Sequence, residues 1–591
     1  MMNSSSFRQC HKHMATASHH RILQGAFSRC SNNRFLRFTY TLRSFTSSSS
    51  ATPDATTAFL AKHPALPTAT IPKRGLTLSK LGFGAYRVND TQPAHRAALV
   101  KAIHAGVNVI DTSSHFGYGA SETFVGSTLQ ELFKEGTIKR EEVVIVSKAG
   151  FILSPTTTLQ PEILSGIPSY AKISETSYHS IHPSFLKAQL TASLQRLQLE
   201  KIDIFMINNP ERMLGNKTGG YNKTRLYKEI AEAFAYLDQE VQQGRIGGYG
   251  MCSNALHLPT TEDHLSLKAI IKTRMDFGWS LDNFVALQAP LNLFERELVT
   301  DVFPSKSLAR EAKEFNIFVF TNRPLNAIAG GQIVTLENKG LHNRQETSAR
   351  LLDTLDQSFT TLAEMELDIK EILDDESMAL KFVWSEILSE NLSRLCSNYF
   401  AAKHFLEREV LPAINRDLKA LQESVVKGKN SSSSSSSNNC NHSRKLHDNN
   451  QSGDDVDDKD SDNDLVDKDA VLSWIDRYRS EAKSLTKKIA AFCQLDSDKR
   501  NDELNLVLGL ICREFVSDVS PNKVENIGSP LSTKSIQYCI ANPNVGCTLV
   551  GMRTPEYVHD AVASAEASER LTKKDLELIA QCPLLLATTH E

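Results

Sequence analysis

Short apolar runs alternate with amphipathic segments along residues 78–330, and one further apolar run follows near the C-terminus. The runs are rich in β-branched residues and are typical of buried strands, whereas the segments between them have apolar residues three and four positions apart, as packed helices do. The predicted strands are Leu78–Val88, Val107–Ser113, Glu142–Gly150, Ile202–Asn209, Ile246–Ser253, Phe284–Leu293, Ile317–Leu325 and Cys547–Arg553. The clearest predicted helices are Pro93–Ala105, Ser121–Lys134, Pro183–Leu197 and Leu226–Gln243.

Strands that alternate with helices in this way predict an α/β fold of the (β/α)8 TIM-barrel class, whose active site lies at the carboxyl ends of the strands. Asp111 ends an apolar strand, where a buried carboxylate needs a partner. A single Asn or Lys at a strand end is more often a solvated loop residue, but a barrel brings all such ends to one mouth. The polar strand-end residues are Asp111, Lys148, Asn208, Ser253, Asn254, Gln288, Asn322 and Arg553.

A long insertion separates the seventh and eighth predicted strands, because far more chain lies between them than a barrel loop needs. Residues 331–426 and 469–530 have apolar residues at helical spacing. Residues 427–468 contain a serine run and an acidic run, cannot bury enough apolar surface to order themselves, and are predicted to be a disordered linker. The barrel then comprises residues 70–330 and residues 531–591, the latter with a C-terminal helix.

Within the insertion, Pro412 predicts a kink or break in a helix. After the linker, the helical pattern covers Asp469–Phe492 and then Asp502–Val516 as two segments. Because the insertion follows strand seven, it starts on the mouth side of the barrel. It is either a lid or interaction bundle over the mouth, with a protein as partner, or an appendage that packs on the side of the barrel, and both interpretations stay open.

Composition argues against several classes of protein. The 591 residues are 40% hydrophobic with a formal net charge of −3, which gives neither a basic nucleic-acid-binding balance nor general disorder. No window is apolar enough to predict a membrane span. The ten cysteines include no C-x-x-C pair, so we predict no metal site and no disulfide framework, and a reducing compartment fits.

The N-terminal residues 1–53 are rich in arginine and serine and contain no acidic residue before Asp54. This composition is typical of organelle transit peptides, and it predicts import into mitochondria. A plastid address and a cytoplasmic protein with a disordered basic tail are the alternatives.

The stretch from Gly106 to Glu122 reads G-x-N-x-I-D-T-S-x-x-F-G-x-G-x-S-E and resembles the signature of the aldo-keto reductase family. The match covers roughly residues 70–330 and 530–570. The resemblance implies a catalytic pair of Asp111 and Lys148. It also implies two departures, since Phe116 stands where the family has a proton-donating tyrosine and Asn208 where it has a histidine that orients the substrate carbonyl.

The same resemblance implies a nicotinamide cofactor, NADP or NAD. Ser253, Asn254 and Gln288 match the residues that bind the nicotinamide carboxamide. Asn322 stands in place of the aromatic that stacks on the ring. The turn at Pro324 and Leu325 matches the one that passes the pyrophosphate, and Gly551 and Arg553 precede the helix on the adenine side.

The missing proton donor leaves three interpretations of the chemistry. In the first, His115 or Tyr118, which flank Phe116, supplies the proton. In the second, Lys148 itself acts as acid or base. Both predict an NAD(P)-dependent oxidoreductase acting on a small carbonyl or alcohol. In the third, the chain is a cofactor-binding scaffold without turnover that regulates a partner, as in the similar potassium-channel beta subunits.

Overall fold

The computed structural model describes residues 50–586 except 154–163, 165, 175, 216–220, 302–304, 330–331, 338–343, 374–375, 397–398, 428–467 and 513–528. Almost all of the predicted transit peptide and of the predicted linker therefore lies outside the described residues, and both stay predictions. The described chain begins inside the predicted presequence. Thr52 caps helix α2 (Pro53–Leu60), and the amide of Ala51 donates to Asp203 Oδ1 at 2.8 Å.

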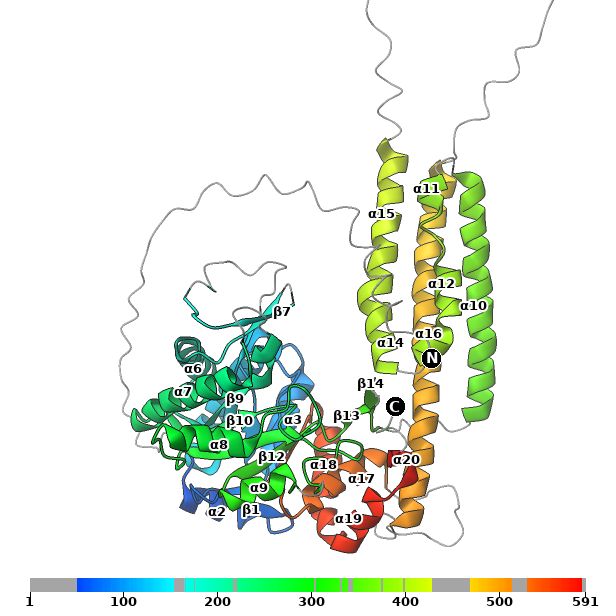
Figure 1. The fold of residues 1–591 in the computed structure, drawn as a ribbon. Helices are drawn as coiled ribbons and strands as arrows, with labels where there is room; N and C mark the ends of the chain where they lie inside the picture. The colour runs from blue at the N-terminus through cyan, green and yellow to red at the C-terminus, as the bar shows by residue number, and fades with distance from the viewer. Residues whose placement is uncertain are drawn as a thin grey trace, which may run out of the picture. The chain divides into compact units, whose positions relative to one another are not determined.

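Parallel strands close into a barrel (Figure 1), which confirms the predicted TIM-barrel class. Neighbouring strands are in register at their carboxyl ends, since Cys252 pairs with both Asn208 and Gln288, and Gly84 pairs with Asp111. The barrel strands, in chain order, are β3 (Leu81–Gly84), β4 (Val109–Asp111), β5 (Val144–Ala149), β9 (Ile202–Asn208), β10 (Ile246–Cys252), β11 (Phe284–Pro290), β12 (Phe318–Asn322) and β15 (Cys547–Val550).

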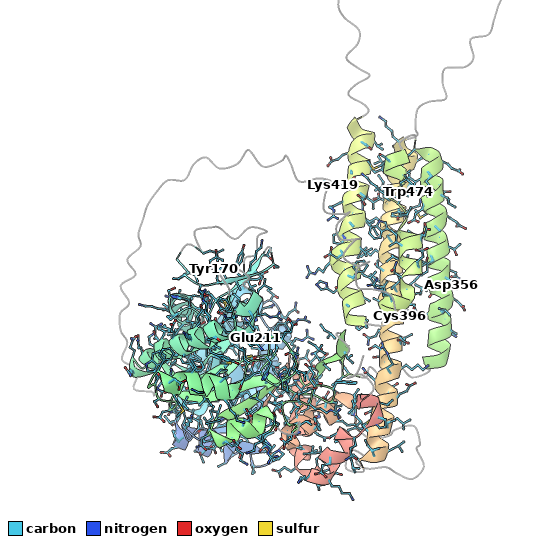
Figure 2. The ribbon with its side chains drawn as sticks, in the orientation of Figure 1. Tyr170, Glu211, Asp356, Cys396, Lys419 and Trp474 are labelled. Atoms are coloured by element: carbon cyan, nitrogen blue, oxygen red, sulfur yellow. The ribbon has the colours of Figure 1, made fainter. Side chains whose placement is uncertain are left out.

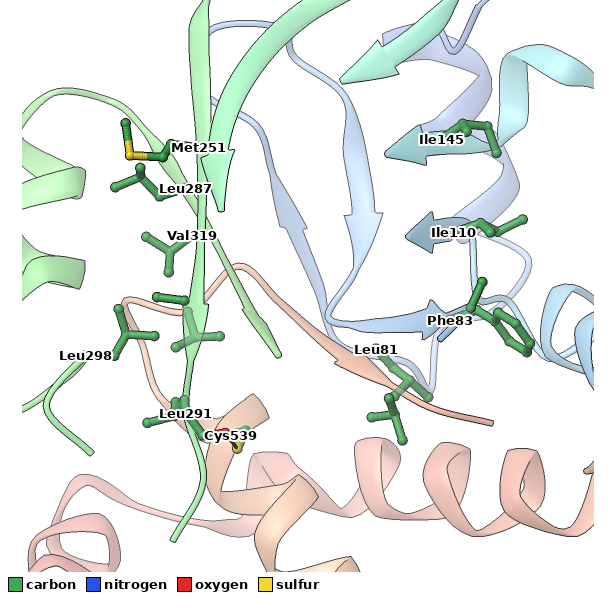
Figure 3. Close-up of a cluster of buried hydrophobic side chains, with 14 of the residues drawn as sticks. Leu81, Phe83, Ile110, Ile145, Met251, Leu287, Leu291, Leu298, Val319 and Cys539 are labelled. Carbon is green, nitrogen blue, oxygen red and sulfur yellow. Dashed lines mark hydrogen bonds between the residues drawn. The ribbon is translucent and has the colours of Figure 1, made fainter. Parts of the chain in front are cut away.

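Alternate side chains of these strands face two different cores. Val109, Val146 and Phe320 belong to a cluster inside the barrel. Phe83 and Ile110 belong to the larger cluster between the strands and the surrounding helices, part of which Figure 3 shows. The helices that follow the strands are α3 (Pro93–His104), α4 (Ala120–Glu135), α6 (Pro183–Leu197), α7 (Lys223–Gln242), α8 (Leu267–Asp276), α9 (Leu308–Glu314) and α17 (Leu531–Ala541), with α18 (Pro555–Ala567), α19 (Lys573–Ala580) and α20 (Pro583–Leu586) after β15.

The first predicted strand, Leu78–Val88, is two strands. Its start is β2 (Thr77–Ser79), which pairs antiparallel with β1 (Thr68–Thr70), and only β3 joins the barrel. Leu78 belongs to the cluster inside the barrel, so the hairpin closes one end of that core.

Two small sheets at the strand ends were not predicted. β6 (Phe151–Leu153), β8 (Ser177–His179) and β7 (Ala171–Ser174) form an antiparallel sheet after β5. β13 (Asn326–Ala329) and β14 (Gln332–Thr335) form a hairpin after β12.

The insertion is helical, as predicted, and has a core of its own. Trp474 (labelled in Figure 2) packs edge-on against Phe382 and stacks on Tyr478 at 4.7 Å between ring centroids. The Tyr478 hydroxyl donates to the buried carboxylate of Glu366 at 2.7 Å. The helices are α10 (Arg344–Ile372), α11 (Glu376–Ala379), α12 (Trp384–Glu390), α13 (Leu392–Cys396), α14 (Tyr399–Phe405), α15 (Leu411–Lys427) and α16 (Lys468–Ile511).

These helices are more continuous than predicted. A π-helical turn, Leu406–Val410, joins α14 to α15 just before Pro412, so the chain stays helical there and does not break, and this irregular turn lies where a kink or break was predicted. The two segments predicted after the linker form the single helix α16, because polar side chains replace apolar ones where the pattern lapses: Asp498 and Asn501 are buried. Of the helices in the described ranges, none combines the length and apolar character that a membrane span needs.

Candidate active site

Asp111 and Lys148 form a buried ion pair at the carboxyl ends of β4 and β5. The Lys148 Nζ lies 2.6 Å from Asp111 Oδ1 and donates to the Thr112 carbonyl at 2.9 Å. Lys148 is 3% exposed and Asp111 is 4% exposed. Because the strands are parallel neighbours, the two ends meet at one edge as the sequence predicted. The pair places an ammonium group at the barrel mouth with its charge compensated.

A chain of amides extends from Asp111 across three more strands. Gln288 Nε2 donates to Asp111 Oδ1 at 2.9 Å. Gln288 Oε1 accepts from the Cys252 thiol at 3.0 Å and from Asn322 Nδ2 at 3.2 Å. The Gln288 side chain therefore has both of its polar ends occupied within the protein, and its first role is to hold the Asp111 carboxylate.

Phe116 lies beside the ammonium, with Lys148 Nζ 5.2 Å from the centroid of its ring. The next residues, Gly117 and Tyr118, have φ of 58° and 57°, in the left-handed region. This turn directs Tyr118 outward, where it is 62% exposed. The structure therefore does not bring Tyr118 to the Asp111–Lys148 pair, contrary to the prediction that Tyr118 supplies the proton in place of the missing tyrosine.

His115, the other residue that flanks Phe116, does lie in the mouth. Its Nδ1 lies 2.7 Å from Ser113 Oγ, which also donates to the Lys148 carbonyl at 2.9 Å. The neutral ring has one nitrogen that carries a hydrogen and one that has a lone pair. Burial, followed by the charge of Lys148 and the neighbouring His179, lowers the pKa of His115 to about 3. His115 is thus a neutral hydrogen-bond acceptor at physiological pH.

Asn208, at the end of β9, lies next to His115. Its side-chain Nδ2 is 3.4 Å from His115 Nδ1, and its backbone carbonyl accepts from His179 Nε2 at 2.6 Å. A Cβ at Gly150 would lie 2.3 Å from the Asn208 carbonyl, so only glycine fits there. His179 was not predicted as a site residue, because β8 follows β5 outside the alternating pattern and its histidine belongs to no motif.

We expect His179 to make the protein acid-sensitive. Burial lowers its pKa from 6.5 to about 4, since protonation would charge a buried ring whose Nδ1 has no partner among the described residues. Below pH 6.5 the unfolded chain then binds a proton that the folded chain does not, so stability falls as the pH drops from 6.5 to 4. Urea denaturation at pH 7 and pH 5 measures how far the free energy of unfolding drops between them. This drop should be about 2 kcal/mol smaller for His179→Gln than for the wild type. Equal losses would contradict this prediction.

Glu211 holds the ends of β9 and β10 together. Its carboxylate accepts from Asn209 Nδ2 at 2.8 Å, from the backbone N–H of Asn254 at 3.0 Å and from Ser253 Oγ at 3.0 Å. Burial raises the pKa of Glu211, and these hydrogen bonds oppose the rise. Ser253 therefore has a structural role here. Glu211 (labelled in Figure 2) was not predicted as a site residue, because in the sequence it follows strand four as an ordinary loop carboxylate.

Two groups in this mouth are suited to the amide of a nicotinamide. Asn322 Oδ1 is buried and has no partner among the described residues, and the side chain of Asn254 lies half-buried at the strand end. Asn322 Oδ1 can accept a hydrogen bond, and the Asn254 side chain can accept or donate one. Within the described ranges, no group of His, Cys, Asp and Glu side chains suits a metal ion.

The residues predicted to pass the pyrophosphate and adenine lie around the same mouth. The Pro324 carbonyl accepts from Ser535 Oγ at 2.5 Å, and Leu325 packs against the barrel core. Gly551 and Arg553 are exposed in the segment that enters α18, whose first turn Thr554 caps. Arg553 is a cation available to an anionic ligand.

Comparisons with known proteins agree with this geometry. Residues 80–365 match the model of the aldo/keto reductase family. The chain is 25% identical over 239 residues to the NADH-specific methylglyoxal reductase of Escherichia coli, which is 39% of this chain and 60% of that protein. It is 29% identical over 210 residues to the D-threo-aldose 1-dehydrogenase of a Pseudomonas species, 33% of this chain and 56% of that protein.

Among solved structures, an aldo-keto reductase from Bacillus halodurans in its holo form aligns with a TM-score of 0.41 and 14% identity, over 89% of this chain and 98% of that one. The chain spans about 60% of the length of the two curated relatives it matches. The signature around Asp111, the parallel barrel and the family match agree. Residues 80–365, which include the signature around Asp111, match the aldo/keto reductase family.

Proposed function

We propose that this protein is an NAD(P)-dependent oxidoreductase that interconverts a small alcohol and its carbonyl. The observation that carries the proposal is the ammonium of Lys148, held by Asp111 beside Phe116 and His115. A positive charge in this mouth stabilises negative charge that develops on a substrate oxygen.

The cofactor part of the proposal rests on the open polar groups of the mouth. Asn254 and the unpartnered Asn322 Oδ1 would hold the nicotinamide carboxamide, the Pro324–Leu325 turn would lie along the pyrophosphate, and Arg553 would meet a phosphate or ribose. When bound, the nicotinamide supplies or takes up the hydride. The E. coli relative is named for NADH, but the groups described here do not distinguish NADH from NADPH.

His115 is the group that would exchange a proton with the substrate. As a neutral imidazole it would accept the proton of an alcohol at the ring nitrogen that has a lone pair, and the resulting imidazolium would return that proton to a carbonyl in the reverse direction. Its pKa is lowered to about 3, so the imidazolium is scarce at neutral pH. A base with so low a pKa is a weak proton acceptor, so we expect slow turnover.

Cofactor titration tests the proposal. The full chain should bind NADPH or NADH, and Asn254→Ala should weaken that binding about fivefold to tenfold, as the loss of one hydrogen bond does. Asn391→Ala, which changes an exposed asparagine of the insertion, is the matched control and should leave the affinity unchanged. Turnover is then measured in both directions on a panel of alcohols and carbonyls. Failure of both cofactors to bind would refute the proposal.

The second candidate is a cofactor-binding scaffold without turnover. Phe116 and Asn208 favour it, because neither side chain can transfer a proton. Tight cofactor binding together with no oxidation or reduction across the panel would select this candidate. A protein partner at the helical insertion would then be sought.

A further inference from the structure

Two cysteines of the insertion face each other across a helix contact. Cys396 is the last residue of α13, and Cys493 lies near the middle of α16. Their sulfurs are 3.4 Å apart. A disulfide needs about 2.05 Å, so the sulfurs have to approach by roughly 1.4 Å, which small side-chain rotations can supply. The pair is therefore placed for a covalent bond.

The two thiols differ in access. Cys493 is fully buried, whereas Cys396 is half-buried and is reachable from solvent. The hydrogen bond from Cys493 lowers the pKa of the Cys396 thiol, which favours its thiolate. The other described cysteines are all buried: Cys252, Cys512, Cys539, Cys547 and Cys582. Cys396 is thus the described cysteine best placed to react first.

We propose that Cys396 and Cys493 form a reversible disulfide that locks α13 onto α16. The oxidant is a low-molecular-weight disulfide. The Cys396 thiolate attacks one of its sulfurs, the S–S bond breaks, and one small thiol leaves with the proton that Cys396 gave up. The Cys493 sulfur then attacks the Cys396 sulfur, gives up its own proton, and releases the second small thiol. Two protein thiols are oxidised, and one small disulfide is reduced to two thiols.

The bond would join positions 97 residues apart. The intervening chain includes α14, α15 and the whole connection from α15 to α16, so the crosslink would restrict a long loop of the unfolded chain and stabilise the folded insertion. Two turns further along α16, Asn501 Nδ2 donates to the carbonyls of Thr335 and Glu337 at 2.7 and 3.0 Å. Arg500 Nη2 also donates to the Cys396 carbonyl at 3.3 Å. Oxidation would therefore fix the part of α16 that is bonded to the end of β14 and the segment after it.

Oxidised glutathione is the probe for the full chain. We expect the protein to lose two hydrogens in mass, to yield a non-reduced peptide pair that joins Cys396 to Cys493, and to melt about 5 °C higher or more. Dithiothreitol should reverse all three changes. Cys582→Ala, which removes another buried cysteine, should keep the crosslink and the shift.

The single variants separate the two steps. Cys493→Ser should stop at a mixed disulfide between glutathione and Cys396, with no rise in melting temperature, and Cys396→Ser should form neither product. If Cys493→Ser has a lower melting temperature than the wild type in the reduced state, Cys396→Ser is compared with the wild type instead, because Cys396 is only half-buried. The proposal is overturned if the wild type keeps both thiols free, if it accumulates the Cys396 mixed disulfide, or if the crosslink forms without a rise in melting temperature.

Discussion

Phe116→Tyr is expected to raise the rate of carbonyl reduction by roughly 10²- to 10⁴-fold, the usual contribution of a positioned general acid. The substitution adds one oxygen to a ring whose centroid lies 5.2 Å from Lys148 Nζ, and it leaves the rest of the mouth unchanged. An adjacent ammonium makes a phenol a better acid. The gain is measured as kcat/KM for a carbonyl substrate with the cofactor that binds, at pH 7.

Two controls isolate the new hydroxyl. Phe151→Tyr places a hydroxyl on another ring that packs against His115, at 4.9 Å between centroids, and should give no such gain. Phe116→Tyr combined with Lys148→Met should lose it. In the wild type, His115→Phe should reduce the slow alcohol oxidation, whereas in the Phe116→Tyr background it should matter less. A rate for Phe116→Tyr equal to that of the wild type would show that this position no longer faces the substrate.

The barrel could be predicted because its signal is repeated. Each strand is a separate apolar run, and parallel strands must end at one mouth, so Asp111, Lys148, Gln288 and Asn322 were expected together before any coordinates. The structure shows them joined by hydrogen bonds. The sequence could not show that Gln288 is occupied by Asp111, since that depends on side-chain rotamers.

The failures have local physical causes. Tyr118 was expected in the site because it is two residues from Phe116, but two consecutive left-handed residues reverse its direction. His179 comes from a small antiparallel sheet that has no place in the barrel pattern. Glu211 was missed because a carboxylate in a loop is usually solvated, and only the fold shows the three donors around it.

The helical insertion shows the same limit of pattern reading. Its helices were expected from their apolar spacing, but α16 continues through residues where that spacing fails. There, Gln494 Nε2 donates to Asp498 Oδ1 at 2.8 Å, so a polar pair four residues apart takes the place of apolar packing. The proposed disulfide between Cys396 and Cys493 would restrain this insertion.

Asp111→Asn is expected to destabilise the protein by about 3–5 kcal/mol and to abolish turnover. The substitution keeps the size of the side chain and an oxygen that can accept from Gln288 Nε2, but it removes the charge that compensates Lys148. An ammonium that is 3% exposed is then buried without a counter-charge, and this is the costly way to break a buried pair. Chemical denaturation at pH 7 measures the loss.

Removing both charges tests the cause. In Asp111→Asn combined with Lys148→Met, no unpaired charge remains, so the double variant should be more stable than Asp111→Asn alone, by about 2 kcal/mol. Its turnover should stay absent, because the ammonium that stabilises the substrate oxygen is gone. If the double variant is instead less stable than Asp111→Asn, the carboxylate contributes through packing and hydrogen bonds, and the ion pair is not what organises the mouth.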